Sequence, residues 1–319
     1  MTVAPHPVAL QPPDIEAWRE SPCGIPYVHE RASGRAGPEV LLAALVHGNE
    51  YSGAHVLAAL LAGGFAPRRG RVTLAFCNVE AFERFDAARP DASRCVQEDF
   101  NRLWSPGVLD GAGASPDLRR ARELRPFVDR CTHLLDLHSM HEPCQPLLVT
   151  GTQPRNIEFA RALHSPGQIV IDEGHADGVR MRDYEGGAPG HARVALLLEA
   201  GQHWQAGSVA HARDVTMRFL LGAGSIERED VPPGWLLADA MRQEAVRVTH
   251  RIVARSGEFR FLDDFTGGEV IARQGTAIAV DRGGYVRTPY DDCVLVMPSL
   301  RQLRPGVTTV RLGSRVILR

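Results

Sequence analysis

The chain has 319 residues, of which 44% are hydrophobic and 23% are charged, and its formal net charge is −2. These values are typical of a soluble globular protein with one large domain and a smaller one, and they give no reason to expect nucleic acid or a membrane surface as a partner. Residues 1–13 show no signal peptide and no apolar run approaches membrane-spanning length, so we expect a cytoplasmic protein.

Residues 40–224 alternate short apolar runs with helical segments, which predicts an α/β fold with a mostly parallel sheet flanked by helices. The predicted strands are 40–46, 71–77, 133–138, 168–171 and 193–199. The predicted helices are 52–61, 117–129, 154–163 and 208–221. Ser115 and Pro116 supply an N-cap and a first-turn proline for the second of these helices.

The pattern changes after Gly222, and from residue 244 the chain consists of short β-runs separated by glycine and proline. The predicted strands in this region are 258–262, 269–272, 277–281, 294–297 and 308–312. Frequent turn signals between them are typical of a small barrel or sandwich. We therefore predict an α/β domain of residues 1–225, with residues 1–39 as an N-terminal lead-in, and a small all-β, barrel-like domain of residues 226–319.

The tetrapeptide His47-Gly48-Asn49-Glu50 follows the first predicted strand, and another predicted strand ends in His138. In an open α/β sheet the strand ends gather at one rim, which would bring these side chains together. Zinc accepts imidazole nitrogen and carboxylate oxygen ligands, and a hydrolytic zinc site keeps an open position for water. His47, Glu50 and His138 are therefore our candidate metal ligands.

Two further polar features are candidates for a binding or catalytic site. Residues 94–104 contain two arginines, two acids and an asparagine. This set suits a site that binds carboxylates, and the alternative is a solvated loop with surface ion pairs. Glu199 ends a strongly apolar strand, where an ionised side chain is costly to bury without a partner. It could be a metal ligand, half of an ion pair or a general base.

Two residue types narrow the chemistry further. The six cysteines lie far apart with no C-x-x-C pair, which is typical of reduced thiols rather than of a cysteine-based zinc site. All 36 basic residues are arginine. The absence of lysine excludes Schiff-base catalysis, a P-loop lysine and a lipoyl or biotinyl carrier lysine.

The chain resembles the succinylglutamate desuccinylase/aspartoacylase family, a branch of the zinc carboxypeptidase superfamily, in the order and approximate spacing of four segments. These are residues 47–50, 94–104, 136–138 and 198–201. The resemblance covers about residues 40–220, and the C-terminal β-region also resembles the family's appended small domain and a biotinyl/lipoyl-like barrel. Within the arginine-containing motif, only Trp104 departs from the family, which has another aromatic residue there.

The resemblance implies a zinc-carboxypeptidase-like sheet and one zinc ion per chain, held by His47, Glu50 and His138. It also implies that Glu199 activates the zinc-bound water and passes its proton to the leaving amine. Zinc lowers the pKa of bound water to about 7 and polarises a carbonyl, which supports both roles.

For the substrate, the resemblance implies that Arg94 polarises the scissile carbonyl and that Asn101 and Arg102 hold the α-carboxylate. An arginine aimed at the developing oxyanion acts where the negative charge appears. Asp136 lies two residues before His138 on the same strand face, so it could orient this ligand.

We therefore predict a zinc-dependent hydrolase that removes the acyl group from an N-acylated amino acid, or a related small amine, that carries a carboxylate. The first alternative is a zinc carboxypeptidase acting on short peptides, because the same residues serve both reactions. The alternative from another class is a non-catalytic, metal-containing binding protein, and the presence of the base Glu199 argues against it. The C-terminal region could be structural, close over the active site or form a contact in a homo-oligomer.

A glycine-rich loop is predicted for residues 178–190, at the rim of the site. It carries Arg180, Arg182 and Tyr184, and His191 follows it. These side chains could set the specificity for the substrate's side chain, and the alternative is that they are solvated.

Four other residues are open candidates. His141 could contact the substrate or the metal, or it could be a hydrogen-bonded structural residue. His203 could line the pocket. The resemblance implies a basic residue from the C-terminal domain near the substrate, and Arg282 or Arg287 could take that place because the chain has no lysine.

Overall fold

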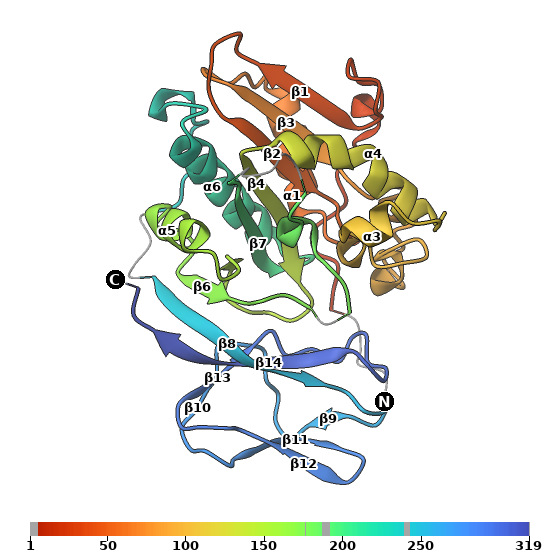
Figure 1. The fold of residues 1–319 in the computed structure, drawn as a ribbon, viewed down its shortest axis with the longest axis vertical. Coiled ribbons are helices and arrows are strands. Elements are labelled where there is room, and N and C mark those ends of the chain that lie inside the picture. Colours follow the sequence, from red (N-terminus) through yellow and green to blue (C-terminus); the bar gives the residue numbers. More distant parts are fainter. Residues whose placement is uncertain (1–5, 176, 187–191, 239–242, 319) are drawn as a thin grey trace.

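The computed structural model describes residues 6–175, 177–186, 192–238 and 243–318. An 11-stranded sheet runs through the structure (Figure 1). In spatial order its strands are β1 (Val28–Ala32), β3 (Arg71–Phe76), β2 (Glu39–Ala44), β4 (His133–Met140), β7 (Val194–Gln202), β5 (Leu147–Val149), β6 (Gln168–Ile171), β8 (Glu244–Val253), β14 (Thr308–Val316), β13 (Cys293–Val296) and β10 (Val270–Ile271). Strands β3, β2, β4 and β7 run parallel, as do β5, β6 and β8, and the other neighbours are antiparallel. The predicted α/β fold is confirmed.

Helices cover both faces of the central strands, as Figure 1 shows. The longer helices are α1 (Ser52–Ala62), α4 (Pro116–Arg130), α5 (Pro154–Ala162) and α6 (Ala206–Ala223). Leu42 of β2 packs in one cluster with residues of α1, α5 and α6, whereas its neighbour Leu41 packs in another cluster with residues of α4. Successive strand residues point to opposite faces, so burial on both faces explains why these strands are continuous apolar runs.

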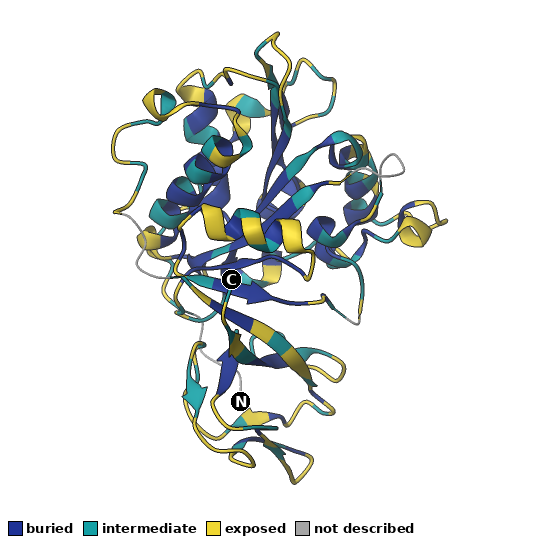
Figure 2. Ribbon diagram, turned by 60° about the vertical axis from the view of Figure 1, so that its left-hand side comes forward, coloured by how far each residue is buried: buried dark blue, intermediate teal, exposed yellow. Residues whose placement is uncertain are grey.

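The C-terminal strands continue the central sheet. β8 pairs in parallel with β6, and β14 pairs along β8. A separate antiparallel sheet contains β9 (Arg260–Phe261), β11 (Ala277–Asp281) and β12 (Gly284–Arg287). Figure 2 shows that the α/β strands are mostly buried, whereas the C-terminal strands mix buried and exposed residues. The small C-terminal β-region is thus confirmed, and a domain boundary at residue 225 stays a prediction.

All strands and helices predicted between residues 40 and 224 are present, with small shifts at their ends. The N-cap at Ser115 is also present, because its side chain accepts a hydrogen bond of 3.1 Å from Leu118 N. Strands β1, β5, β8 and β12 were not predicted. β5 has only three residues, too few for a periodic signal, and β1 is a polar edge strand. Short helices α2 (Val79–Phe82) and α3 (Pro106–Leu109) lie in the loops.

None of the helices in the described part of the chain is both long enough and apolar enough to cross a lipid bilayer.

Candidate active site

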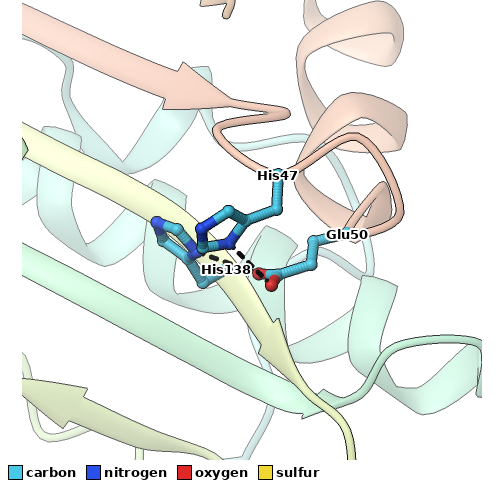
Figure 3. A group of neighbouring side chains, drawn as sticks. All are labelled: His47, Glu50 and His138. Atoms are coloured by element: carbon cyan, nitrogen blue, oxygen red, sulfur yellow. Dashed lines mark hydrogen bonds and ion pairs between the residues drawn. The ribbon is translucent and has the colours of Figure 1, made fainter. Parts of the chain in front are cut away.

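Three side chains meet where β2 and β4 end. These strands pair in parallel with Ala44 opposite Leu137, so the segment after β2 lies beside the end of β4. His47 and Glu50 come from the turn between β2 and α1, and His138 comes from β4 (Figure 3). Each residue can offer one ligand atom, and these atoms lie within 4.8 Å of one another. The grouping is consistent with a single metal ion.

The Glu50 carboxylate joins the two histidines. Its Oε1 lies 2.8 Å from His47 Nδ1, and its Oε2 lies 2.9 Å from His138 Nδ1. Burial raises the pKa of Glu50, but the two imidazoles outweigh burial and hold this pKa well below its usual range. Two imidazole nitrogens and a carboxylate that converge at one buried place form a donor set that fits zinc. A zinc ion would take the place of the protons on these two nitrogens.

Each of these histidines also has an acid at its other ring nitrogen. His47 Nε2 lies 3.0 Å from Asp99 Oδ1, and His138 Nε2 lies 2.9 Å from Asp136 Oδ1. Metal-ligating histidines usually donate their second N–H to a carboxylate or carbonyl, which sets the ring orientation. The structure places Asp136 where the sequence suggested. Asp99 was not expected in this role, because it lies 52 residues from His47 in the sequence.

Residues 94–104 form a wall of the site. Phe100 and Trp104 are buried in the core, which leaves the polar side chains between them on the cavity side. Arg94 Nη1 donates to Glu50 Oε1 at 2.9 Å, and its Nη2 donates to Asp99 Oδ2 at 3.4 Å. The guanidinium that was expected to polarise a carbonyl therefore lies directly beside the candidate metal ligands.

Asn101 and Arg102 lie in the 3-10 helix Phe100–Arg102. Asn101 Oδ1 accepts a hydrogen bond of 2.8 Å from Met181 N, and Arg102 Nε lies 3.3 Å from Asp177 Oδ1. Both side chains line the same cavity as the three candidate ligands. The alternative of a solvated surface loop is therefore wrong for Asn101 and Arg102.

Asp117, which the sequence reasoning missed, holds the backbone of this segment. Its carboxylate accepts hydrogen bonds from the backbone N–H groups of Val96, Gln97 and Glu98 at 3.0, 2.8 and 3.1 Å, and from Asn78 Nδ2 at 2.7 Å. It lies in the first turn of α4, where a negative charge is stabilised by the helix dipole. Its position directly after a helix N-cap and proline was the signal that could have found it.

Gly48 allows the turn after β2 to pack closely against the backbone of residues 81–82 and 93–94. Its N–H donates to Arg94 O at 3.1 Å. A Cβ atom at this position would lie 2.4 Å from Ala81 C and 2.5 Å from both Phe82 N and Ser93 O. Only glycine avoids contact with these backbone atoms.

Glu199 faces the candidate ligands from β7, where it pairs in register with His138. It lines the cavity, and its Oε2 is buried without a hydrogen-bond partner among the described residues. Burial raises the pKa of Glu199 to about 8, and Glu50 adds to this rise while His138 and Arg94 oppose it. A carboxyl group with a pKa close to neutrality can take up and return a proton, and a bound cation would lower that pKa.

Arg180 and Arg311 form a second polar wall. Arg180 Nη1 donates to Asp172 Oδ2 at 3.1 Å, and Arg311 Nε lies 3.3 Å from the same oxygen. Arg311 Nη2 also lies 2.9 Å from His175 Nε2. Because Arg311 belongs to β14, the C-terminal region supplies part of the cavity.

The arginines suggested for this place from the C-terminal sequence are elsewhere. Arg282 and Arg287 are exposed and do not line the cavity, and Arg287 Nη1 instead donates to Gly275 O at 2.7 Å. That suggestion was wrong. Arg311 was missed because it lies in an alternating strand with no motif around it.

The loop after residue 177 is not solvated in its described part. Arg180, Arg182 and Tyr184 are all buried, so the solvated alternative is wrong for these three residues. Arg182 Nη2 donates to Thr150 O at 2.6 Å, which ties the loop to the end of β5. His191 lies outside the described residues.

His141 and His203 differ in their access to the cavity. His141 lines it, whereas His203 is fully buried and is not among its lining residues. His203 Nδ1 lies 2.8 Å from Ser139 Oγ, and the centres of the two rings are 4.9 Å apart.

Comparison with known proteins identifies the family. Residues 36–221 match the family model described as the succinylglutamate desuccinylase/aspartoacylase catalytic domain. The chain belongs to the succinylglutamate desuccinylase/aspartoacylase family. This is a family of metal-dependent amidohydrolases, and the candidate metal ligands are present in this member. No curated protein sequence matches the chain significantly.

Several solved structures share the fold of this family member. Succinylglutamate desuccinylase from Vibrio cholerae is 17% identical, with a TM-score of 0.67 over 92% of this chain and 87% of that one. A succinylglutamate desuccinylase/aspartoacylase from Rhodobacter sphaeroides is 19% identical, with a TM-score of 0.63 over 89% and 87%. The product-bound ectoine utilization protein EutE (DoeB) from Ruegeria pomeroyi is 21% identical, with a TM-score of 0.60 over 88% and 86%.

Gly48→Ala should lower the free energy of unfolding by about 1–3 kcal/mol, because three backbone atoms block the added Cβ. Gly107→Ala is the matched control, since no atom lies within 4 Å of its added Cβ. Urea unfolding of both variants tests this expectation. Equal stability of the two variants would contradict it.

Purified protein should contain about one metal ion per chain, which we expect to be zinc. The double variant His47→Ala/His138→Ala should stay folded but lose the ion, because an α/β fold of this size does not need the ion to fold. The exposed His250→Ala is the control and should keep it. Elemental analysis measures the ion and circular dichroism measures the fold. A full equivalent of metal in the double variant would reject this site.

Proposed function

We propose that the protein is a zinc-dependent deacylase that cleaves the amide bond of an N-acyl amino acid or a related small amine. The observation that carries the proposal is the buried group of His47, Glu50 and His138 in one cavity with Glu199, whose Oε2 has no hydrogen-bond partner among the described residues. Zinc held by the first three residues would supply a Lewis acid that lowers the pKa of water and polarises the carbonyl.

Glu199 is the proposed general base. It would take the proton from the attacking water and deliver it to the leaving nitrogen, as a single carboxyl group can do in successive steps. Its place opposite His138 in the cavity wall, and the lack of a hydrogen-bond partner for its Oε2 among the described residues, support this role over that of an ion-pair partner.

Arg94 is the proposed stabiliser of the oxyanion. Its Nη1 lies 2.9 Å from Glu50 Oε1, so its charge acts where the carbonyl of a substrate next to the metal would develop negative charge. Because this guanidinium is already oriented by Glu50 and Asp99, little reorganisation is needed during the reaction.

Asn101 and Arg102 are the proposed partners of the substrate's carboxylate. Burial lowers the pKa of Arg102 although Asp99 raises it, and the cations of Arg94 and Arg180 lower it further. A guanidinium among other cations is stabilised by an additional anion. The side-chain amide of Asn101 adds a directional donor.

The carboxypeptidase alternative uses the same machinery but needs room for a peptide. The C-terminal residues Thr266, Met297 and Ser299 also line the cavity, which reduces the room for a peptide and favours a small molecule. The alternative of a non-catalytic binding protein is disfavoured by Glu199, since a raised-pKa carboxyl group contributes nothing to metal retention.

The direct test is hydrolysis of N-acetyl-, N-formyl- and N-succinyl-L-amino acids by zinc-loaded protein, with short peptides as the competing substrates. Release of a free amino acid from the N-acyl series, and not from the peptides, would support the deacylase. Release of C-terminal amino acids from the peptides alone would favour the carboxypeptidase. Hydrolysis of neither would support the binding protein.

Glu199→Gln should lower kcat by about 10²- to 10⁴-fold while zinc content and KM change little, because only proton transfer is removed. Glu98→Gln and Glu185→Gln are matched controls, since both side chains are exposed and neither lines the cavity. Steady-state kinetics measure kcat and KM for all three variants. Near-normal turnover of the Glu199 variant would remove it as the base.

Arg102→Ala should chiefly raise KM for substrates with a free α-carboxylate, and should change KM far less for the corresponding amides. The reason is that a carboxylate contact present in both the ground and transition states contributes uniform binding. Kinetics on matched acid and amide pairs measure this difference. Equal losses for both members of a pair would show that Arg102 does not bind the carboxylate.

A further inference from the structure

The cavity has two ends of different character. At one end Arg102, Arg180 and Arg311 line the wall. Of the charged groups near His175, these three cations lower its pKa most strongly. At the other end the wall contains His141, and the charges of these three arginines are not among those that act most strongly on it. The arginine cations that act most strongly on the pKa of His141 are Arg94 and Arg301 instead, so Arg102, Arg180 and Arg311 gather away from this ring.

His141 presents an unused hydrogen-bonding atom. Its Nε2 is buried without a partner among the described residues, and so is Nε2 of His203 behind it. His203 is itself fully buried and is held through Ser139 Oγ at 2.8 Å, so the His141 ring rests on a fixed neighbour. A buried polar atom without a partner in a native fold indicates that a ligand or water fills the gap.

The surroundings of His141 favour the neutral form of its ring. Burial and then the Arg94 cation lower its pKa to about 3, and burial holds the pKa of His203 well below its usual range. A neutral imidazole offers one donor and one acceptor and no net charge. A hydroxyl can pair with Nε2 whether this atom donates or accepts, whereas a carboxylate can only accept a hydrogen bond.

The charges around His141 disfavour a second carboxylate at this end. Glu142 lines the cavity one residue further on and is paired with Arg301 at 2.9 Å and with His6 at 2.7 Å. Arg94 is already paired with Glu50 and with a second acid. An acyl chain ending in a carboxylate would meet the carboxylate of Glu142 here.

We propose that the histidine end of the cavity receives the acyl group, and that His141 Nε2 hydrogen-bonds an uncharged polar atom, such as a hydroxyl, on a short acyl chain. The inference rests on the proposed function, because Asn101 and Arg102 hold the amino-acid part at the arginine end. His141 would then be a specificity-determining residue, supported from behind by His203.

The test uses zinc-loaded, full-length protein and isosteric acyl groups on one amino acid, chosen as the best N-acetyl-L-amino acid substrate. The pairs are N-glycolyl against N-propionyl and N-(3-hydroxypropionyl) against N-butyryl. In at least one pair the hydroxyacyl substrate should have a kcat/KM about tenfold higher, because a site built around a hydroxyl rejects the analogue that lacks it. N-succinyl substrates should be poorer than the preferred hydroxyacyl substrate.

The variants His141→Phe and His141→Gln separate hydrogen bonding from ring shape. Phe should remove the roughly tenfold preference and affect the alkyl substrates little, whereas Gln keeps a donor and acceptor and should retain part of the preference. His250→Phe, at an exposed position, should match the wild type. Metal content and circular dichroism accompany each assay.

Three results would overturn the inference alone: equal rates for both wild-type pairs, a preference that survives in His141→Phe, or N-succinyl substrates as good as hydroxyacyl ones. If a variant does not fold, the rates of the wild-type protein on the two members of each pair still test the inference. Failure to hydrolyse any N-acyl amino acid would instead overturn the proposed function, and this inference with it.

Discussion

The burial of Glu50 between His47 and His138 is the constraint on which the rest of the site depends. Three ionisable side chains removed from water are costly unless their charges compensate one another or a bound cation. The parallel pairing of β2 and β4 brings them to one point, and Asp99 and Asp136 extend the network outward so that both imidazoles are held from two sides. Removing one member would leave a buried charge without its partner.

The continuity of the sheet has a consequence for the cavity. Asp172 follows directly after β6, the strand on which the C-terminal strands β8 and β14 are added. This addition brings Arg311 of β14 to Asp172, which also binds Arg180. The same acid therefore joins the two parts of the chain and orients two cations of the cavity wall. The C-terminal β-region is thus part of the site's architecture as well as of the fold.

Local patterns were sufficient to predict the α/β framework and the centre of the site. Continuous apolar runs indicated strands that are buried on both faces, and the polar residues at their ends indicated where β2, β4 and β7 converge. Sequence and structure agree at His138 and Glu199, because the parallel strands β4 and β7 end at one rim. The glycine at position 48 has a separate explanation, which is a close backbone approach that only glycine permits.

The sequence by itself determined which residues group as candidate metal ligands, that Glu199 is the candidate base, and where the arginine-containing wall lies, since each follows from residue type beside a periodic element. Only the tertiary structure decided that Asp99 orients His47 and that Asp117 holds residues 96–98. It also decided that Arg311, rather than Arg282 or Arg287, completes the cavity. These contacts join segments far apart in the chain, and nothing local distinguishes such an acid or arginine from a solvated one. The sheet pairing that brings them together therefore decides their roles.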